Sequence, residues 1–275
     1  MGYRTFASGE AAMCSPDLIR QVAATLGPSD RLSGGSGVPL PRQAGSRSFS
    51  RVIDLTHPLP TDFPSANGEI WLEIEDVMTF EVHGINFKRW KLHEHLGTHI
   101  DAPIHFSRDG WTSDAIPVVS LVLPLAVVDI RSRAASDPDA ELSVEDIQVW
   151  EAEHGQLPPG CCVGMLSGWD SRATGAGYRN VDDQGRMHFP GVHPDAAQML
   201  IEDRQVAGLG VDTLSLDHGI STEFPTHRRW LPSGRWGAEG LANLTDVPAA
   251  GATIIVGAPT VVGATGGPSR IIALA

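Results

Sequence analysis

The stretch His95-Leu-Gly-Thr-His99-Ile-Asp101-Ala-Pro-Ile-His105 is the most informative part of this chain. Three of the chain's eleven histidines and one aspartate lie within it. Imidazole nitrogens and carboxylate oxygens are ligands of divalent cations such as Zn²⁺ and Mn²⁺. No cysteine lies nearby, which argues against a structural zinc knuckle. This clustering predicts a metal site that the surrounding fold has to support.

Simple geometry limits the backbone of this run. A helix would place His95 and His99 on one face, but Asp101 would point away, and Gly97 and Pro103 are poor helix residues. On a straight strand, His95 and Asp101 would lie about 20 Å apart. Ligands about 2.1 Å from one ion cannot be that distant. We therefore expect a tight, curved loop, bent at Gly97 and stiffened by Pro103.

The segments on either side of the run resemble strands more often than helices. Residues 70–77 alternate apolar and acidic side chains with period two, and Phe87–His93 leads directly into the run. Further strands are expected at residues 51–56, 121–130, 161–166, 206–211, 253–256 and 270–274. Helices are expected at Ser143–His154, with Ser143 as the N-cap, and at His193–Asp203. This pattern favours a mixed sheet, α/β or α+β, with few helices.

The chain divides into an extension and a main domain. Residues 1–50 contain one short helix candidate, Ser15–Leu26, and a Gly/Ser/Pro-rich linker, Gly27–Arg47. Residues 51–275 form the predicted main domain, which contains the metal-binding run. The beginning of the chain lacks a signal-peptide pattern and no stretch is apolar enough to span a membrane, so a cytoplasmic location is expected.

The composition and charge of the chain limit the classes of molecule that the protein can bind. Of the 275 residues, 41% are hydrophobic and 19% charged, as in a folded globular protein, and the formal net charge is −13. Such an acidic chain opposes binding to nucleic acid or an anionic membrane and leaves a small molecule as the expected partner. Of the three cysteines, Cys161 and Cys162 fit a buried strand and form no metal-binding pair.

The run resembles the His-x-Gly-Thr-His-x-Asp-x-Pro-x-His signature of the cyclase family, which contains bacterial kynurenine formamidases and isatin hydrolases. The likeness extends from about Val52 to the C-terminus. It includes the opening Asp54-Leu-Thr-His-Pro-Leu, the segments at residues 167–170, 189–191 and 210–217, and the Gly-rich close Gly263-Ala-Thr-Gly-Gly-Pro-Ser269. The resemblance implies an α/β swivelling β/β/α fold, a mixed sheet with peripheral helices, and a homodimer or higher oligomer.

The resemblance also implies roles for individual residues. His95, His99 and Asp101 would bind a first Mn²⁺ or Zn²⁺ ion, and Asp101 would bridge it to a second ion held by His227 and Glu239. His105 would be the catalytic proton shuttle. Phe63 stands where kynurenine formamidases usually place a substrate-contacting tryptophan. His218 and Glu223 are the alternative ligands if His227 and Glu239 do not bind the second ion. His93 and Glu94, immediately before the run, are expected to support the ligands.

These features together predict a hydrolase that attacks with metal-activated hydroxide. The first expectation is opening of a non-peptide C–N bond in a small cyclic amide or imide of the isatin type. The alternatives are an arylformamidase acting on N-formylkynurenine, and a lactone hydrolase or cyclase-dehydratase with the same site. A Ser/His/Asp hydrolase is disfavoured because Gly-x-Ser-x-Gly is absent. A metal-binding protein without catalytic activity is the remaining class.

Overall fold

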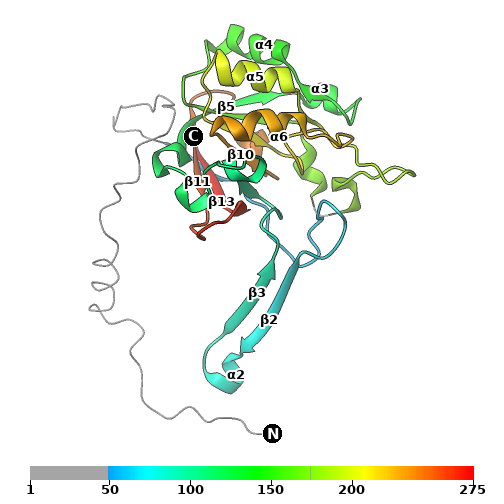
Figure 1. Cartoon of the computed structure of the whole chain (residues 1–275), viewed down its shortest axis with the longest axis vertical. Coiled ribbons are helices and arrows are strands. Elements are labelled where there is room, and N and C mark those ends of the chain that lie inside the picture. Colours follow the sequence, from blue (N-terminus) through cyan, green and yellow to red (C-terminus); the bar gives the residue numbers. More distant parts are fainter. Residues whose placement is uncertain (1–48, 174) are drawn as a thin grey trace. The chain divides into compact units, whose positions relative to one another are not determined.

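A computed structural model describes residues 49–173 and 175–275, which belong to one compact unit. The predicted helix Ser15–Leu26 and linker Gly27–Arg47 lie outside the described residues. Within the described part, a mixed nine-stranded sheet has the order β1-β13-β11-β5-β7-β9-β10-β4-β12 (Figure 1). Its strands are β1 Val52–Asp54, β4 His99–Asp101, β5 Val122–Asp129, β7 Cys162–Leu166, β9 Gly208–Val211, β10 Trp236–Glu239, β11 Ala252–Gly257, β12 Gly266–Pro268 and β13 Arg270–Leu274.

The centre of the sheet is parallel and both of its edges are antiparallel. Strands β5, β7, β9 and β10 run parallel, whereas β4 and β12 on one side and β11, β13 and β1 on the other pair antiparallel. Every residue of β7 is buried, as expected for a central parallel strand covered on both faces. Cys161 and Cys162 are buried there, as the sequence predicts. The predicted α/β class with a mixed sheet is confirmed.

Helices cover one face of the sheet (Figure 1). They are α3 Arg131–Ala134, α4 Val144–His154, α5 Pro194–Glu202 and α6 Pro225–Trp230. Apolar side chains of α4, α5 and α6 share one core with the central strands, including Ile147, Leu200 and Trp230. Helix α4 begins where the sequence predicts, because the Ser143 hydroxyl accepts from the Asp146 N–H and Asp146 accepts from the Ser143 N–H.

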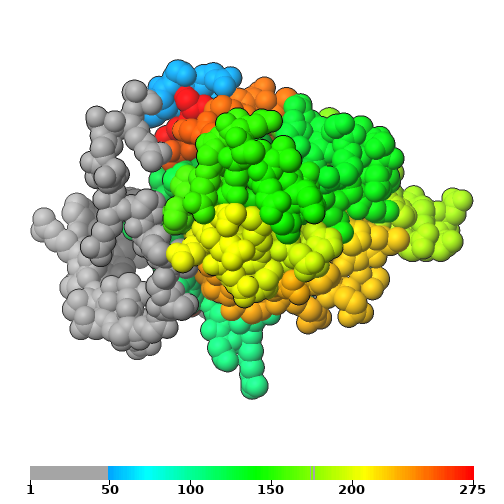
Figure 2. Space-filling model, turned by 90° about the horizontal axis from the view of Figure 1, so that it is seen from above, coloured from blue at the N-terminus to red at the C-terminus, as the bar shows by residue number. Residues whose placement is uncertain are grey.

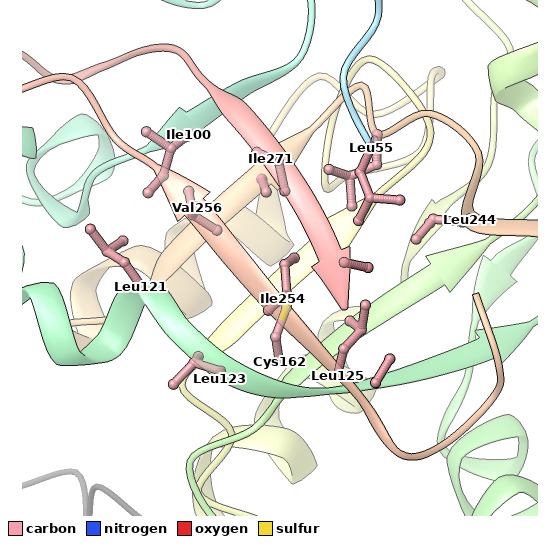
Figure 3. Packing of buried hydrophobic residues seen from close by; sticks show 14 of the residues in the cluster. Leu55, Ile100, Leu121, Leu123, Leu125, Cys162, Leu244, Ile254, Val256 and Ile271 are labelled. Carbon is pink, nitrogen blue, oxygen red and sulfur yellow. The ribbon is translucent and has the colours of Figure 1, made fainter. Parts of the chain in front are cut away.

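A second core lies among the antiparallel strands. Figure 3 shows Leu55, Leu125, Ile254 and Ile271 converging there with Leu123 and Cys162. All of these side chains are at most 2% exposed, so this core is as fully excluded from solvent as the core beneath the helices. Because the central strands are buried on both faces, their sequences are almost continuously apolar rather than alternating.

The remaining elements are short. A two-stranded ribbon of β2 Leu72–Met78 and β3 Phe87–Leu92, joined through α2 Phe80–His83, projects from the sheet (Figure 1). Strands β6 Glu141–Leu142 and β8 Gly191–Val192 form a small parallel pair. The 3₁₀ helices are η1 Pro103–Phe106, η2 Ser113–Ala115, η3 Val118–Leu121, η4 Trp169–Arg172, η5 Ala176–Tyr178, η6 Leu231–Ser233 and η7 Leu244–Asp246. No helix in the described ranges is long and apolar enough to cross a membrane.

Candidate metal centre

Three candidate ligands come from two adjacent strands. Strand β4 carries His99 and Asp101, and because side chains two residues apart share a face, both point the same way. Its antiparallel neighbour β10 places Glu239 directly opposite His99. Glycine stands opposite Asp101 on both sides, at Gly237 in β10 and Gly266 in β12. The register of three strands therefore collects two carboxylates and one imidazole on a single buried face.

His95 reaches the same place from a turn. Gly97 has a φ of 69°, a left-handed conformation that glycine adopts without strain, and the chain bends here between His95 and His99. The Nδ1 atom of His95 lies 2.7 Å from Oδ1 of Asp101. A Cβ atom at Gly266 would lie 2.8 Å from the His95 ring, so this glycine leaves room for the imidazole. The left-handed turn brings together residues that a straight strand would hold apart.

The predicted curved loop is correct only in part. The backbone bends at residues 94–95 and 97–98, whereas His99–Asp101 is a regular strand and Pro103–Phe106 is a 3₁₀ helix. The prediction that the whole run is loop is therefore wrong. The physical reason is that β10 and β12 pair with β4 on both sides and satisfy its backbone hydrogen bonds, which the local sequence does not reveal.

The last candidate ligand, His227, is held by α6. Asp217 accepts hydrogen bonds from the backbone N–H groups of Thr226 and His227, at 2.8 and 3.1 Å. These are among the first N–H groups of the helix, which have no partner within it. The Asp217 carboxylate also lies 2.6 Å from Nδ1 of His227. One buried carboxylate thus fixes both the start of the helix and the orientation of the imidazole.

The five side chains form two overlapping clusters with a shared carboxylate. Ligand atoms of His95, His99 and Asp101 lie within 4.8 Å of one another, as do those of Asp101, His227 and Glu239. His99 Nε2 lies 3.4 Å from Asp101 Oδ1 and 3.2 Å from Glu239 Oε2. His227 Nε2 lies 3.3 Å from Asp101 Oδ2 and 3.0 Å from Glu239 Oε1. The structure therefore brings together all five residues predicted as metal ligands.

The far nitrogen of each imidazole has a partner that accepts a hydrogen. His99 Nδ1 lies 2.9 Å from the Gly97 carbonyl oxygen, and His227 Nδ1 faces Asp217. His95 Nε2 lies 2.9 Å from the Thr265 hydroxyl, which donates its own hydrogen to Glu94. Because these partners accept, each far nitrogen carries the proton. In the neutral imidazoles, the lone pairs of the near nitrogens then point at Asp101 and Glu239.

That arrangement fits a bound cation. Three lone pairs and two carboxylates facing one another repel unless positive charge lies between them. The buried Nε2 atom of His99 has no hydrogen-bond partner among the described residues, although both carboxylates lie near it. Imidazole and carboxylate with no thiolate suit Zn²⁺ or Mn²⁺. The donor set therefore fits the predicted metal.

Without a metal, protons take the cation's place. Burial by itself lowers the pKa of His99, but Asp101 and Glu239 outweigh burial and raise that pKa to about 10. Burial likewise lowers the pKa of His227, and the same two carboxylates with Asp217 raise it well above its ordinary value. Burial raises the pKa of Asp101, yet hydrogen bonds from the three histidines hold it well below the usual range. The site has a strong affinity for positive charge.

His105 lies beside the cluster without joining it. Its ring stacks on His95 with centroids 3.8 Å apart and lies 6.2 Å from the His227 ring. Burial lowers the pKa of His105 more than the nearby carboxylates raise it. Among the described residues, no hydrogen bond to its ring nitrogens is found, and it belongs to neither ligand cluster. Its imidazole is therefore neutral at pH 7 and able to accept a proton.

A narrow apolar pocket adjoins His95 and His99. Phe63 forms one wall, and its ring meets that of Tyr178 edge to face at 6.0 Å. Pro64, Ala66, Leu214 and the turn at Gly97 also line it. Trp169 stands behind this wall, where its indole N–H donates to the Tyr178 carbonyl oxygen. Phe63 therefore lies where it can contact a molecule that approaches the two histidines.

The other histidines and acids near the run lie apart from both clusters. His218 is 3.0 Å from Glu141, and Glu223 is exposed at the start of α6, so neither substitutes for His227 or Glu239. His93 is exposed and stacks on Trp71. Glu94 supports His95 through Thr265.

Sequence reasoning missed two residues that orient ligands, Asp217 and Thr265. Asp217 lies in a segment quoted for the resemblance, and Thr265 lies in its Gly-rich close, but no local pattern marks either role. A metal-binding histidine usually donates its second N–H to an acceptor. That rule would have prompted a search for such acceptors, although not for these particular residues.

Comparison with known proteins agrees with this geometry. The Cyclase family model, described as "Putative cyclase", matches residues 53–218. Isatin hydrolase of Roseibium aggregatum is 36% identical over 228 residues, covering 78% of this chain and 85% of that protein. Kynurenine formamidase of Salinibacter ruber is 30% identical over 192 residues, covering 68% of this chain and 79% of that protein.

Solved structures show the same fold. Isatin hydrolase A from Labrenzia aggregata, bound to benzyl benzoate, superposes with a TM-score of 0.76 and 34% identity, covering 82% of this chain and 93% of that one. The family match, the relatives and the shared fold lead to one assignment. The chain belongs to the cyclase family and is a metal-dependent hydrolase.

Proposed function

We propose that this enzyme opens a non-peptide C–N bond in a small cyclic amide or imide of the isatin type. The observation that carries the proposal is the convergence of three imidazole lone pairs and two carboxylates beside an aromatic pocket. The 36% identity to an isatin hydrolase over most of both chains supports the substrate class.

Each side chain has a part in this proposal. His95, His99 and Asp101 would hold one Mn²⁺ or Zn²⁺ ion, and Asp101, His227 and Glu239 a second one. Burial favours this assignment, because the Asp101 and Glu239 carboxylates are only 1% and 7% exposed and buried charge requires compensation. The Asp101 carboxylate has one oxygen toward His95 and the other toward His227, as expected of a bridging ligand.

The remaining groups supply binding and proton transfer. A divalent cation, when bound here, polarises the scissile carbonyl and lowers the pKa of a water molecule. The neutral His105 imidazole takes a proton from the attacking water and returns it to the departing ring nitrogen. The C–N bond breaks while the new C–O bond remains, which gives an arylamine and a carboxylic acid; the acid then releases its proton to solvent and becomes a carboxylate. Phe63, in the wall of the pocket beside His95 and His99, would contact an aromatic substrate.

A chelation experiment tests the proposed function. The enzyme is stripped with chelator, and hydrolysis of isatin is followed before and after Mn²⁺ or Zn²⁺ is restored. We expect activity to disappear with the metal and to return with it. Absence of isatin turnover by the metal-restored enzyme would refute the substrate assignment.

The kynurenine formamidase match favours a second candidate, hydrolysis of an aryl formamide. The same site can attack a formyl carbonyl, and the proton again passes to an arylamine nitrogen. N-formylkynurenine, a simple imide and a lactone therefore belong in the same assay. The substrate with the highest kcat/KM decides among ring opening, deformylation and ester chemistry.

A further inference from the structure

Residues 179–188 leave the body of the protein as a short hairpin, which we call the hairpin loop. Figure 2 shows it in yellow-green, protruding from the body. Val181 and Met187 form its antiparallel bridge. At its turn, the Asp182 carboxylate accepts two backbone N–H groups and lies 2.7 Å from the Arg186 guanidinium. The tip of the hairpin loop is therefore held by contacts within its own segment.

Both ends of the hairpin loop lie against the pocket beside the metal centre. Tyr178, which precedes the loop, lines the pocket and contacts Phe63. Arg179, the first residue of the loop, donates to the carbonyl oxygen of the pocket-lining Ala66 at 3.2 Å. Phe189, which follows the loop, is 2% exposed in the same apolar cluster as Phe63 and Tyr178. The position of the hairpin loop is therefore coupled to that of the pocket wall.

His188 ties the base of the hairpin loop to the body. Its Nδ1 atom lies 2.6 Å from Asp139 Oδ2, in the segment between α3 and β6. Its Nε2 atom lies 3.2 Å from Asp182 Oδ2, in the hairpin loop. Its backbone N–H donates to the Asn180 carbonyl oxygen, and the Asn180 amide donates to the His188 carbonyl oxygen. The ring thus joins two segments that lie 49 residues apart in the chain.

This geometry requires the charged form of His188. Carboxylate oxygens only accept hydrogen bonds, and a neutral imidazole has one N–H group, so it satisfies one carboxylate and turns a lone pair toward the other. The imidazolium donates to both. Hydrogen bonds to Asp139 and Asp182 accordingly raise the pKa of His188 more than burial lowers it. Among the described residues outside the metal centre, no other histidine has a carboxylate at each ring nitrogen.

The surroundings of His188 are acidic. The titratable groups that face it or its partners are Asp137, Asp139, Glu141, Asp182, Arg186 and His218. Arg186 pairs with Asp182, and His218 lies 3.0 Å from Glu141, so each of these two groups has an acidic partner of its own. The buried Oδ1 atom of Asp139 has no hydrogen-bond partner among the described residues. Asp139 therefore depends on His188 for compensation of its charge.

We propose that the charged form of His188 is a positioning device for the substrate pocket, which holds the hairpin loop, and with it Tyr178 and Arg179, until the imidazolium loses its proton. Only the identification of this pocket as the substrate's rests on the proposed function. The pKa of His188 is raised above its ordinary value of 6.5. The tie is therefore complete below about pH 6.5 and is lost as the pH rises through the raised pKa.

Hydrogen exchange of the full chain tests the tie without any substrate. Exchange of residues 179–190 is followed by mass spectrometry from about pH 6 to about pH 10, and each rate is divided by the intrinsic rate at the same pH. We expect protection to fall by about tenfold or more as His188 loses its proton, since a charge-assisted hydrogen bond is lost. The buried strand β7 should keep its protection. Constant protection of the hairpin loop across this range overturns the proposal.

Two variants assign the change in protection to the imidazolium. His188→Gln keeps hydrogen-bonding groups but no charge, so its hairpin loop should be as weakly protected in acid as that of the wild type in alkali. Asp139→Asn should lower the pH at which protection falls by about one pH unit or more. His154→Gln is the matched control, because His154, on α4, lies 3.8 Å from a single carboxylate. Wild-type protection in His188→Gln, or an unchanged midpoint in Asp139→Asn, contradicts the proposal.

Kinetics tests the link between His188 and the pocket. For any substrate that the enzyme turns over, the KM of His188→Gln is divided by the wild-type KM at each pH. Loss of metal on acidification affects both proteins alike and cancels in this ratio. We expect a ratio of several-fold near pH 6 that approaches one in alkali, with kcat equal in the two proteins. A ratio that does not change with pH would make His188 a purely structural residue and overturn the proposal.

The two proposals fail in different ways. Absence of turnover with every substrate would refute the proposed function, and hydrogen exchange would still decide whether His188 holds the hairpin loop. Turnover with a pH-independent KM ratio would refute the role of His188 and leave the proposed function intact.

Discussion

Asp217 lies 2.6 Å from Nδ1 of His227 and also accepts the backbone N–H of the same residue. The carboxylate thus fixes the tautomer of the imidazole and the helix that carries it. Because Asp217 is 2% exposed, solvent cannot replace it.

Asp217→Asn should weaken metal binding without abolishing the fold. The amide can still accept from one backbone N–H group, but it loses the charge that stabilises the imidazole as a ligand. We expect affinity for the ion at His227 to fall by about 10- to 100-fold, measured by calorimetric titration of the stripped enzyme. Glu223→Gln, an exposed carboxylate nearby in sequence, should match the wild type; equal losses in both variants would contradict this role for Asp217.

His105→Ala separates proton transfer from metal binding. His105 contacts His95 only through ring stacking and belongs to neither ligand cluster. We expect full metal content with kcat lowered by about 10² or more. His218→Ala, which alters a histidine paired with Glu141, should leave kcat unchanged. Loss of metal together with activity in His105→Ala would make His105 a ligand instead.

Metal binding should release protons. Asp101 and Glu239 raise the pKa of metal-free His99 to about 10, so near pH 7 the ion must displace that proton, and another from His227. The affinity for the metal ion therefore rises with pH up to about 10. It falls on acidification, by about tenfold per pH unit for each proton displaced. Calorimetry in buffers of different ionisation enthalpy counts the protons, and a count of zero would rule out this exchange.

Phe63→Leu tests the wall of the pocket. Phe63 is 5% exposed, and leucine retains an apolar side chain with a smaller loss of packing than alanine would cause. We expect KM for an aromatic substrate to rise several-fold with metal content unchanged, because an aromatic contact is worth about 1 kcal/mol. Thermal unfolding of the variant checks the fold. An unaltered KM would place the substrate elsewhere.

Much of the fold could be predicted from sequence because its signals are local. The capping box at Ser143 and the continuous apolar run of β7 each depend on neighbouring residues alone. The spacing of His95, His99 and Asp101 likewise predicts a metal site, because these residues are close together in the sequence. The exact path of the run could not be predicted, since β4 exists only through pairing with strands more than 130 residues further along the chain.

The second half of the site shows the same limit. His227 and Glu239 look unremarkable in sequence, and only resemblance to the cyclase family singled them out. Their proximity to Asp101 depends on β10 pairing with β4 and on Asp217 holding α6. Asp217 and Thr265 act through hydrogen bonds across the fold, and such contacts leave no periodic trace in the sequence.

Anomalous diffraction from crystals grown with Mn²⁺ tests the central claim most directly. The account predicts a strong anomalous peak enclosed by His95, His99 and Asp101, with ligand atoms at about 2.0–2.2 Å, and a second peak beside His227 and Glu239 if two ions bind. A crystal of active enzyme with no peak among these five side chains would contradict the account.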